Sequence, residues 1–167
     1  MRLSVFNTDQ PFDLNDRPTF HVVVIYEDSA AGKRAKHFYD MAIRELADEC
    51  DFSFELWSFE VLALPEIGNS VAQVAAKADF VILSMQGKAQ LSVQTRDWLE
   101  KWLKLIANHD HKPALIALLD RHETKSETAA STLAYLGKIA DRHEISFYAP
   151  ASFEGTKQRS RVNNWVR

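Results

Sequence analysis

Short runs of hydrophobic residues alternate along the chain with longer segments in which apolar positions recur every three or four residues. The short runs lie at residues 21–26, 79–84, 114–119 and 146–149. Runs of this length that are bounded by polar or turn-forming residues are typical of strands buried on both faces of a sheet. A further segment, residues 51–59, alternates between apolar and polar positions, which predicts a half-exposed strand at an edge of the sheet.

The segments between these strands are predicted to be helical, because they carry apolar residues at helical spacing or begin with capping residues. The expected helices contain the stripe Ala35, Phe38, Ala42 and Leu46, a start at Ser70 with Gln73, the stripe Leu99, Trp102, Leu103 and Ile106 after Ser92, and the stripe Ala129, Leu133, Leu136 and Ala140 after Thr124 and Glu127. Strands and helices therefore alternate with short links, which implies right-handed crossovers and a parallel sheet with helices on both faces.

Five strands and four helices in this alternation predict an α/β fold, a three-layer α/β/α sandwich of the flavodoxin-like type. The usual strand order of that fold, 2-1-3-4-5, places residues 51–59 at an edge, as their pattern requires. A fifth helix normally follows the last strand, but residues 151–167 have no long apolar stripe. We therefore expect the last helix to be short or missing, and the N-terminal arm, the tail or a second subunit to cover the exposed strip.

Composition indicates one globular domain over residues 1–167, with an N-terminal arm at 1–20 and a basic C-terminal tail at 151–167. The 167 residues are 46% hydrophobic and 26% charged, and no repeat, linker or change of composition divides them. A net charge of −3 argues against a general nucleic-acid binder. The apolar runs are too short for a membrane span, and the first residues lack a secretory pattern. The lone Cys50 is expected to be a core residue, and we expect a cytoplasmic protein.

Polar residues and glycines follow the first and third predicted strands, at the point where the strand order of this fold reverses. Ligands of open α/β sheets bind at such switch points, next to the carboxyl ends of the strands. The residues expected to bind a small ligand or cofactor there are Ser29, Gly32, Ser84, Gln86 and Gly87. No catalytic motif is complete, so no catalytic residue is assigned.

The segment 21–103 resembles flavodoxins and NADPH-dependent FMN reductases. The resemblance is carried by Tyr26-Glu-Asp-Ser-Ala-Ala-Gly32, by Leu64-Pro65, by Ala78-Asp-Phe-Val-Ile-Leu-Ser84 and by Asp97-Trp98-Leu99. It implies FMN as cofactor, with the phosphate held by hydroxyls and backbone N–H groups of the turn after strand one. Here acids and alanines replace those hydroxyls, and the segment that lies against the flavin ring in the reductases reads Met85-Gln-Gly-Lys88. Two acids would repel the phosphate of FMN. An FMN-dependent oxidoreductase, which the resemblance implies, is therefore the alternative function and not the favoured one.

The acidic pair Glu27 and Asp28 also resembles the pair that holds Mg²⁺ in response-regulator receiver domains. This resemblance implies a divalent-cation site at Glu27 and Asp28. The position of the phosphoacceptor aspartate, however, reads Ser84 or Met85, and the last strand ends in Pro150 rather than in lysine. A degenerate receiver-like domain that binds a cation without phosphoryl transfer is therefore a second alternative.

Three further groups of residues are weaker candidates. Lys33 and Arg34, in the first turn of a helix, are expected to be solvated, although they could receive an anion. The segment 120–123 could form a metal or acid–base cluster with the acidic pair, but a polar loop is the simpler interpretation. His109 and His111 precede the fourth strand, at the opposite end of the sheet, and are expected to be a solvated turn.

These observations favour a non-catalytic regulatory or interaction module with a small-ligand pocket between the ends of the first and third strands. We expect it to associate with itself or with a protein partner. A ligand that is cationic, or hydroxylated and weakly charged, suits the acidic turn better than a bare phosphate does.

Overall fold

The sheet of the protein consists of five parallel strands in the order β2-β1-β3-β4-β5. The computed structural model describes residues 18–46, 48–120, 122–123 and 125–150. Within them the strands are β1 (Thr19–Tyr26), β2 (Asp51–Ser58), β3 (Phe80–Met85), β4 (Ala114–Leu119) and β5 (Phe147–Tyr148). The expected fold class and strand order are thus confirmed, including the place of β2 at an edge.

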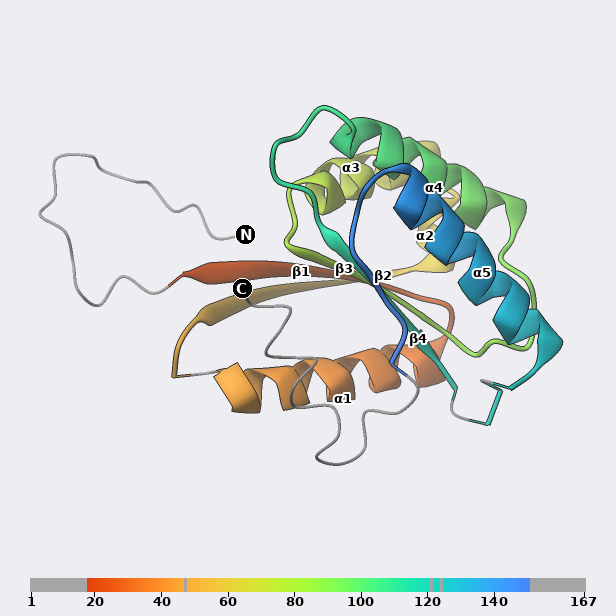
Figure 1. The fold of residues 1–167 in the computed structure, drawn as a ribbon, viewed down its shortest axis with the longest axis horizontal. Coiled ribbons are helices and arrows are strands. Elements are labelled where there is room, and N and C mark those ends of the chain that lie inside the picture. The colour runs from red at the N-terminus through yellow and green to blue at the C-terminus, as the bar shows by residue number, and fades with distance from the viewer. Residues whose placement is uncertain (1–17, 47, 121, 124, 151–167) are drawn as a thin grey trace, which may run out of the picture.

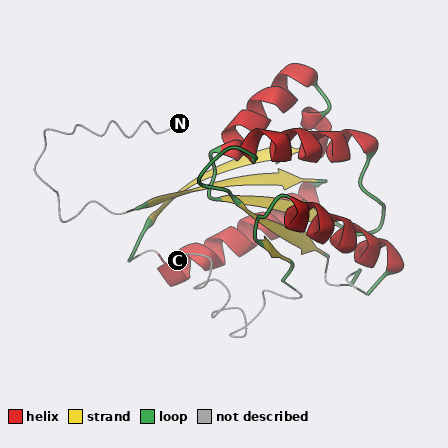
Figure 2. Ribbon diagram, turned by 45° about the horizontal axis from the view of Figure 1, so that its top comes forward, coloured by secondary structure: helices red, strands yellow, loops and turns green. Residues whose placement is uncertain are grey.

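Helices cover both faces of this sheet, as a parallel sheet requires. They are α1 (Ser29–Leu46), α2 (Phe59–Leu62), α3 (Pro65–Ala76), α4 (Val93–Ile106) and α5 (Glu127–Arg142). Figure 1 and Figure 2 show α1 beneath the sheet, while α2, α3, α4 and α5 lie above it. The described helices therefore share the two faces unequally, with α1 alone on one side.

The buried core is divided by the sheet into two layers, because successive side chains of a strand point to opposite faces. Val23 and Ile25 of β1 pack with the four helices above the sheet, whereas Val22 and Val24 pack against α1. The upper layer includes Trp102, which is fully buried. The central strands have continuous hydrophobic runs because both of their faces are buried, one in each layer of the core.

Two tryptophans of α4 contribute to the upper layer rather than to a ligand site. Their rings stack at a centroid distance of 6.2 Å, and both side chains are buried. The indole Nε1 of Trp98 donates a hydrogen bond of 2.9 Å to the carbonyl of Gly68 in α3. Trp98 and Trp102 therefore serve the packing of the upper layer.

The starts of two helices differ from the sequence prediction. Helix α3 begins at Pro65, five residues before the predicted cap Ser70, and a short helix α2 precedes it. Proline is favoured in the first turn of a helix because its missing N–H would be unpaired there. Helix α5 is capped by Ser126, whose Oγ accepts the N–H of Ala129 at 3.0 Å. The predicted cap Thr124 lies outside the described residues.

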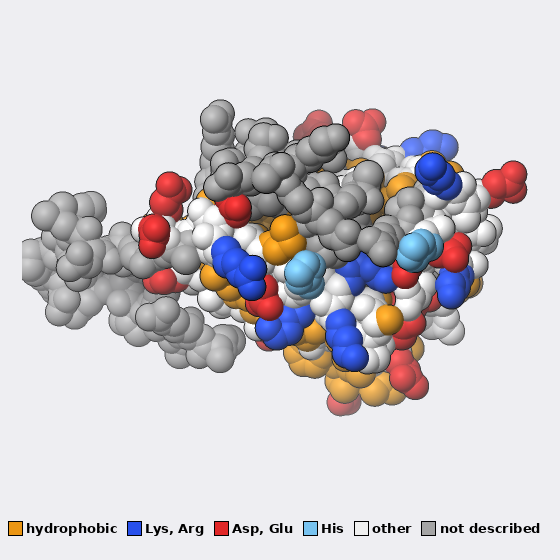
Figure 3. Space-filling view, turned by 90° about the horizontal axis from the view of Figure 1, so that it is seen from below, with side chains coloured by type: hydrophobic (Ala, Val, Ile, Leu, Met, Phe, Trp, Pro, Cys, Tyr) orange, Lys and Arg blue, Asp and Glu red, His pale blue; other side chains and the backbone are white. Residues whose placement is uncertain are grey.

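The face covered by α1 is the one on which a fifth helix would be expected. Phe52 and Phe54 of β2 and Tyr148 of β5 are only partly buried on this face. Figure 3 shows the face from below, with hydrophobic side chains gathered along its lower margin. The segments 1–17 and 151–167, which were expected to include the covering arm and tail, lie outside the described residues.

Cys50 is buried next to Leu46, in agreement with its predicted role as a core residue. None of the helices in the described part of the chain is long and apolar enough to cross a membrane.

Candidate functional site

The turn between β1 and α1 is held by the carboxylate of Asp28. Its Oδ1 accepts the N–H of Ala31 at 2.8 Å, and its backbone carbonyl accepts the N–H of Gly32 at 2.9 Å. Asp28 is therefore the residue that caps α1, and the neighbouring Ser29 is already the first residue of the helix. Aspartate and serine are equally good capping residues, so the choice depends on where the chain leaves the strand.

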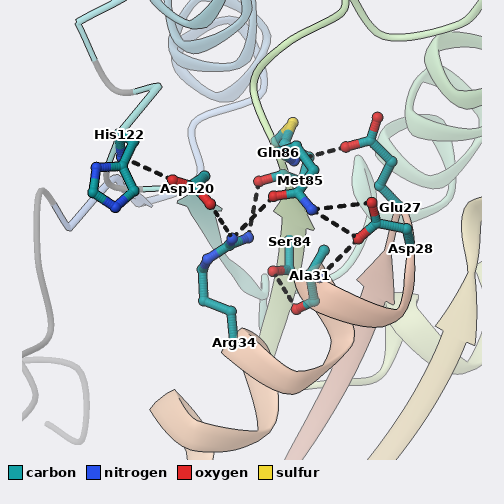
Figure 4. Close-up of polar contacts among 9 residues, drawn as sticks. All are labelled: Glu27, Asp28, Ala31, Arg34, Ser84, Met85, Gln86, Asp120 and His122. Atoms are coloured by element: carbon teal, nitrogen blue, oxygen red, sulfur yellow. Dashed lines mark hydrogen bonds and ion pairs between the residues drawn. The ribbon is translucent and has the colours of Figure 1, made fainter.

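Gln86, directly after β3, binds both acids of this turn (Figure 4). Its backbone N–H donates to Glu27 Oε2 at 2.7 Å. Its side-chain Nε2 donates to both oxygens of Asp28, at 3.2 and 3.1 Å. The two carboxylates that the sequence proposed as metal ligands are thus already hydrogen-bonded to a residue proposed as a cofactor ligand.

Ser84 joins the end of β3 to the first turn of α1. Its side chain is fully buried, and its Oγ donates a hydrogen bond of 2.7 Å to the carbonyl of Ala31. Its own carbonyl accepts the N–H of Glu27 at 2.9 Å. The hydroxyl and the carbonyl of Ser84 are both engaged within the protein, which gives this predicted site residue a structural role.

Arg34 reaches from α1 across the end of β3 to the end of β4. Its guanidinium donates to the carbonyl of Met85, to Gln86 Oε1 and to Asp120 Oδ2, each at 3.1 Å. The side chains of Arg34 and Asp120 are 13% and 28% exposed. The prediction that Arg34 is solvated is therefore wrong. No spacing in the sequence pairs residues 34 and 120; only the strand order brings them together.

Gly87 has a conformational reason to be glycine. Its φ of 85° lies in the left-handed region that side chains rarely adopt. A Cβ at this position would also lie 3.4 to 3.5 Å from side-chain carbons of Glu123, Leu119 and Ala129. Its proposed part in ligand binding remains a prediction.

The local hydrogen bonds lower the pKa of two carboxyl groups. The N–H of Ala31, followed by Gln86 and Arg34, holds the pKa of Asp28 below its ordinary value of 3.8. The backbone N–H of His122, followed by Arg34, holds the pKa of Asp120 below the same value. Both groups are therefore charged at neutral pH, although burial opposes the charge in each case.

Acid is expected to destabilise the protein through these two groups. A carboxyl group whose pKa is lowered by folding stabilises the folded state above its unfolded pKa, and this contribution is lost as the pH falls below about 4. In Asp28→Asn the amide oxygen can still accept the N–H of Ala31 but cannot titrate. Urea unfolding of both proteins between pH 7 and pH 3 measures the effect. The variant should lose less stability than the wild type, and equal losses would contradict this assignment.

A hollow of about 570 Å³ opens beside this network, between α1 and the ends of β1 and β2. Ser29 and Gly32 line it, whereas Ser84, Gln86 and Gly87 are not among its lining residues. Its lining comprises Tyr26, Glu27, Asp28, Ser29, Gly32, Lys33, Lys36, Leu56, Ser58 and Glu60. The hollow therefore brings together only part of the predicted cofactor-binding set, and it opens towards the edge strand.

Gly32 borders this hollow beside the ring of Tyr26, which a Cβ there would meet at an ordinary contact distance of 3.4 Å. The ring of Tyr26 thus lies next to the first turn of α1. Leu56, which is 39% exposed, adds a second apolar group to the lining. Apolar contact surface lined also by three acids and two lysines suits a small polar organic molecule.

The described residues contain no group of three or more His, Cys, Asp or Glu side chains placed to hold a metal ion. The Mg²⁺ hypothesis therefore has only Glu27 and Asp28 to support it, and it remains a prediction. At the opposite end of the sheet, His111 Nε2 lies 2.9 Å from Asp79 Oδ1. The turn that contains His109 and His111 is exposed as expected, but His111 has this acidic partner.

No family model matches the chain, and no curated protein is similar to it in sequence. The fold, however, resembles solved structures. A rubredoxin:oxygen oxidoreductase from the anaerobe Desulfovibrio gigas matches with a TM-score of 0.53 and 11% identity, over 90% of this chain and 35% of that chain. A short-chain flavodoxin associated with a non-canonical PDU bacterial microcompartment matches with a TM-score of 0.52 and 11% identity, over 89% of this chain and 94% of that one.

An apo NADH:FMN oxidoreductase matches with a TM-score of 0.49 and 14% identity, over 88% and 86% of the two chains. The chain spans about a third of the length of the rubredoxin:oxygen oxidoreductase and nearly the whole length of the flavodoxin. The protein thus has a flavodoxin-like fold. Identities this low establish the fold alone.

Proposed function

We propose that the protein is a non-catalytic flavodoxin-like domain that acts as a regulatory or interaction module and does not use FMN. The observation that carries this proposal is the position of the Asp28 carboxylate, which caps the N-terminus of α1. In flavodoxins the corresponding turn receives the phosphate of FMN, and a helix N-terminus favours such an anion. Here the protein supplies its own anion at that place.

A phosphate would meet a second unfavourable charge at this turn. Glu27 adjoins Asp28, and its carboxylate is oriented by the N–H of Gln86. A phosphate monoester carries between one and two negative charges at neutral pH, so two fixed carboxylates repel it. The residues present therefore do not fit the phosphate of FMN.

The crevice between the ends of β1, β3 and β4 is also bridged by side chains. Gln86 binds Asp28 on one side, and Arg34 binds Asp120 on the other. A flat ring placed at this switch point would have to displace charged hydrogen bonds, each of which contributes more than a neutral one. This closed crevice supports a module without flavin.

The hollow beside β2 is the proposed place for a small ligand. Three acids, Glu27, Asp28 and Glu60, and two lysines, Lys33 and Lys36, line it. Lys36 is paired with Asp40 at 3.1 Å, so the acids outnumber the one lysine that has no ion pair among the described residues. A cation, or a hydroxylated molecule of low charge, fits this balance.

Fluorescence titration with FMN tests the absence of flavin. The wild-type protein is expected to be purified colourless and to leave the fluorescence of micromolar FMN unchanged, while a flavodoxin apoprotein quenches it in parallel. Asp28→Ser retains a capping hydroxyl but removes one charge, and it measures how much that charge contributes to exclusion. A yellow wild-type protein, or quenching by it, would favour the alternative function of an FMN-dependent oxidoreductase. That alternative is supported by the likeness of the fold.

A further inference from the structure

β2 is an edge strand with few of the features that normally prevent edge-to-edge pairing. It spans eight residues, and among the described residues its only strand partner is β1. Its register with β1 runs without a bulge from Asp51 to Ser58. Natural edge strands are usually protected by lysine, proline, bulges or short length. β2 has none of these and carries only two charges, at Asp51 and Glu55.

The side chains of β2 on the α1 face form an apolar row at the margin of the molecule. Phe52 and Phe54 are partly buried, and Leu56 is 39% exposed. Tyr39 of α1 stacks on Phe54 with a centroid distance of 4.0 Å and meets Phe52 edge-on at 6.0 Å. Tyr39 of α1 thus fixes the two phenylalanine rings of this row. The edge of β2 that is not paired with β1 faces away from the rest of the sheet.

We infer that β2 pairs with β2 of a second copy of this chain, antiparallel and across a two-fold axis perpendicular to the sheet. Such an axis keeps the α1 faces of both copies on the same side, so opposed residues share a face. The two sheets then continue into each other, and the N–H and C=O groups that face outward from each edge strand, with no strand partner among the described residues, become paired.

The two acids of β2 select the register of this pairing. If the axis passed through Ser53, Asp51 of each copy would face Glu55 of the other, and an axis through Glu55 would oppose two glutamates. Like charges directly opposite each other destabilise a strand pair. An axis through Phe54 avoids both contacts and overlaps residues 51–57 of the two strands. An axis through Leu56 also avoids them, but it overlaps only residues 54–58.

The register centred on Phe54 also places apolar residues together. Phe52 faces Leu56 of the second copy, and the two Phe54 rings face each other, with Tyr39 behind each of them. On the other face, Glu55 lies opposite the uncharged Ser53, whose Oγ is within hydrogen-bond distance of His21 Nδ1 at 2.6 Å. Aromatic and aliphatic cross-strand pairs of this kind are favourable. This interface does not depend on whether FMN binds.

Sedimentation velocity of the full chain tests the proposal. The wild type is expected to be a dimer at micromolar concentration. Leu56→Lys places a charge opposite Phe52 and should weaken association by at least about tenfold. Leu64→Lys is the matched control, because Leu64 is 53% exposed but lies outside β2, and it should leave the dimer unchanged. A monomeric wild type, a dimer that tolerates Leu56→Lys, or a dimer lost equally in both variants overturns the proposal.

Cysteine pairing tests the register. In the register centred on Phe54, residue 53 of one copy faces residue 55 of the other. A mixture of Ser53→Cys and Glu55→Cys proteins should therefore form an intermolecular disulfide on mild oxidation, while neither variant should cross-link alone. Cys50 is buried and remains in all samples. Cross-linking of either variant alone to the same extent as the mixture contradicts this register.

Discussion

Replacing Gly68 with alanine is expected to lower the free energy of unfolding by about 2 kcal/mol. A Cβ on Gly68 would lie 2.5 Å from the carbonyl oxygen of Leu62, a distance that requires the backbone to move. The carbonyl of Gly68 also accepts the buried Nε1 of Trp98, so a displacement here disturbs the contact between α3 and α4. The urea midpoint measures the loss.

Gly137→Ala is the matched control for this prediction. Gly137 lies inside α5, and its added Cβ would meet only the ring of Phe147 at an ordinary 3.7 Å. Alanine is favoured over glycine inside a helix by about 0.8–1.0 kcal/mol, so this variant should be as stable as the wild type or more stable. Both changes add the same methyl group to a helix, and their difference therefore isolates the clash. Equal stability of the two variants would contradict the prediction, because it would show that the backbone between α2 and α3 accommodates the methyl group without a loss of free energy of unfolding.

Replacing Arg34 with alanine is expected to lower the free energy of unfolding by about 2 kcal/mol, because hydrogen bonds to charged groups contribute about 1.5–3 kcal/mol. The guanidinium binds the ends of β3 and β4 through Met85, Gln86 and Asp120. Its removal deprives the carboxylate of Asp120 of the ion pair at 3.1 Å. Partial exposure of Asp120 to water keeps the effect below that of a fully buried pair. Urea unfolding at neutral pH measures it.

Two variants control for the loss of a positive charge at this position. Lys33→Ala removes the neighbouring charge from an exposed side chain and should change stability by less than about 0.5 kcal/mol. Arg34→Lys keeps the charge but cannot span three acceptors with one ammonium group, so it should restore only part of the loss. If Arg34→Ala were as stable as Lys33→Ala, the hydrogen bonds of Arg34 to Met85, Gln86 and Asp120 would not contribute to the stability of the fold.

The polar network and the hollow divide the sequence-predicted site into two parts. Ser84 and Gln86 belong to a set of hydrogen bonds that joins α1 to the central strands, whereas Ser29 and Gly32 border the hollow next to β2. Hydroxyl, amide and glycine residues of this kind are typical of ligand sites. Ser84 and Gln86 instead form hydrogen bonds within the protein, because a buried donor or acceptor must find a partner.

Most of the fold could be predicted from the sequence because local patterns determine it. The continuous run 114–119 was predicted with its true bounds, and Ser92 caps α4 through the N–H of Thr95. The edge strand was recognised by its alternation. The starts of α3 and α5 were missed, since several residues near each start have capping chemistry and local sequence does not rank them.

The sequence by itself determined the strand order, the two-sided burial of the central strands and the acidic character of the first turn. Tertiary structure alone decided what those acids do. Asp28 meets Gln86 and Arg34 meets Asp120 because parallel strands far apart in the chain end at one edge of the sheet. Contacts of that kind follow from the packing of whole elements and have no periodicity along the chain.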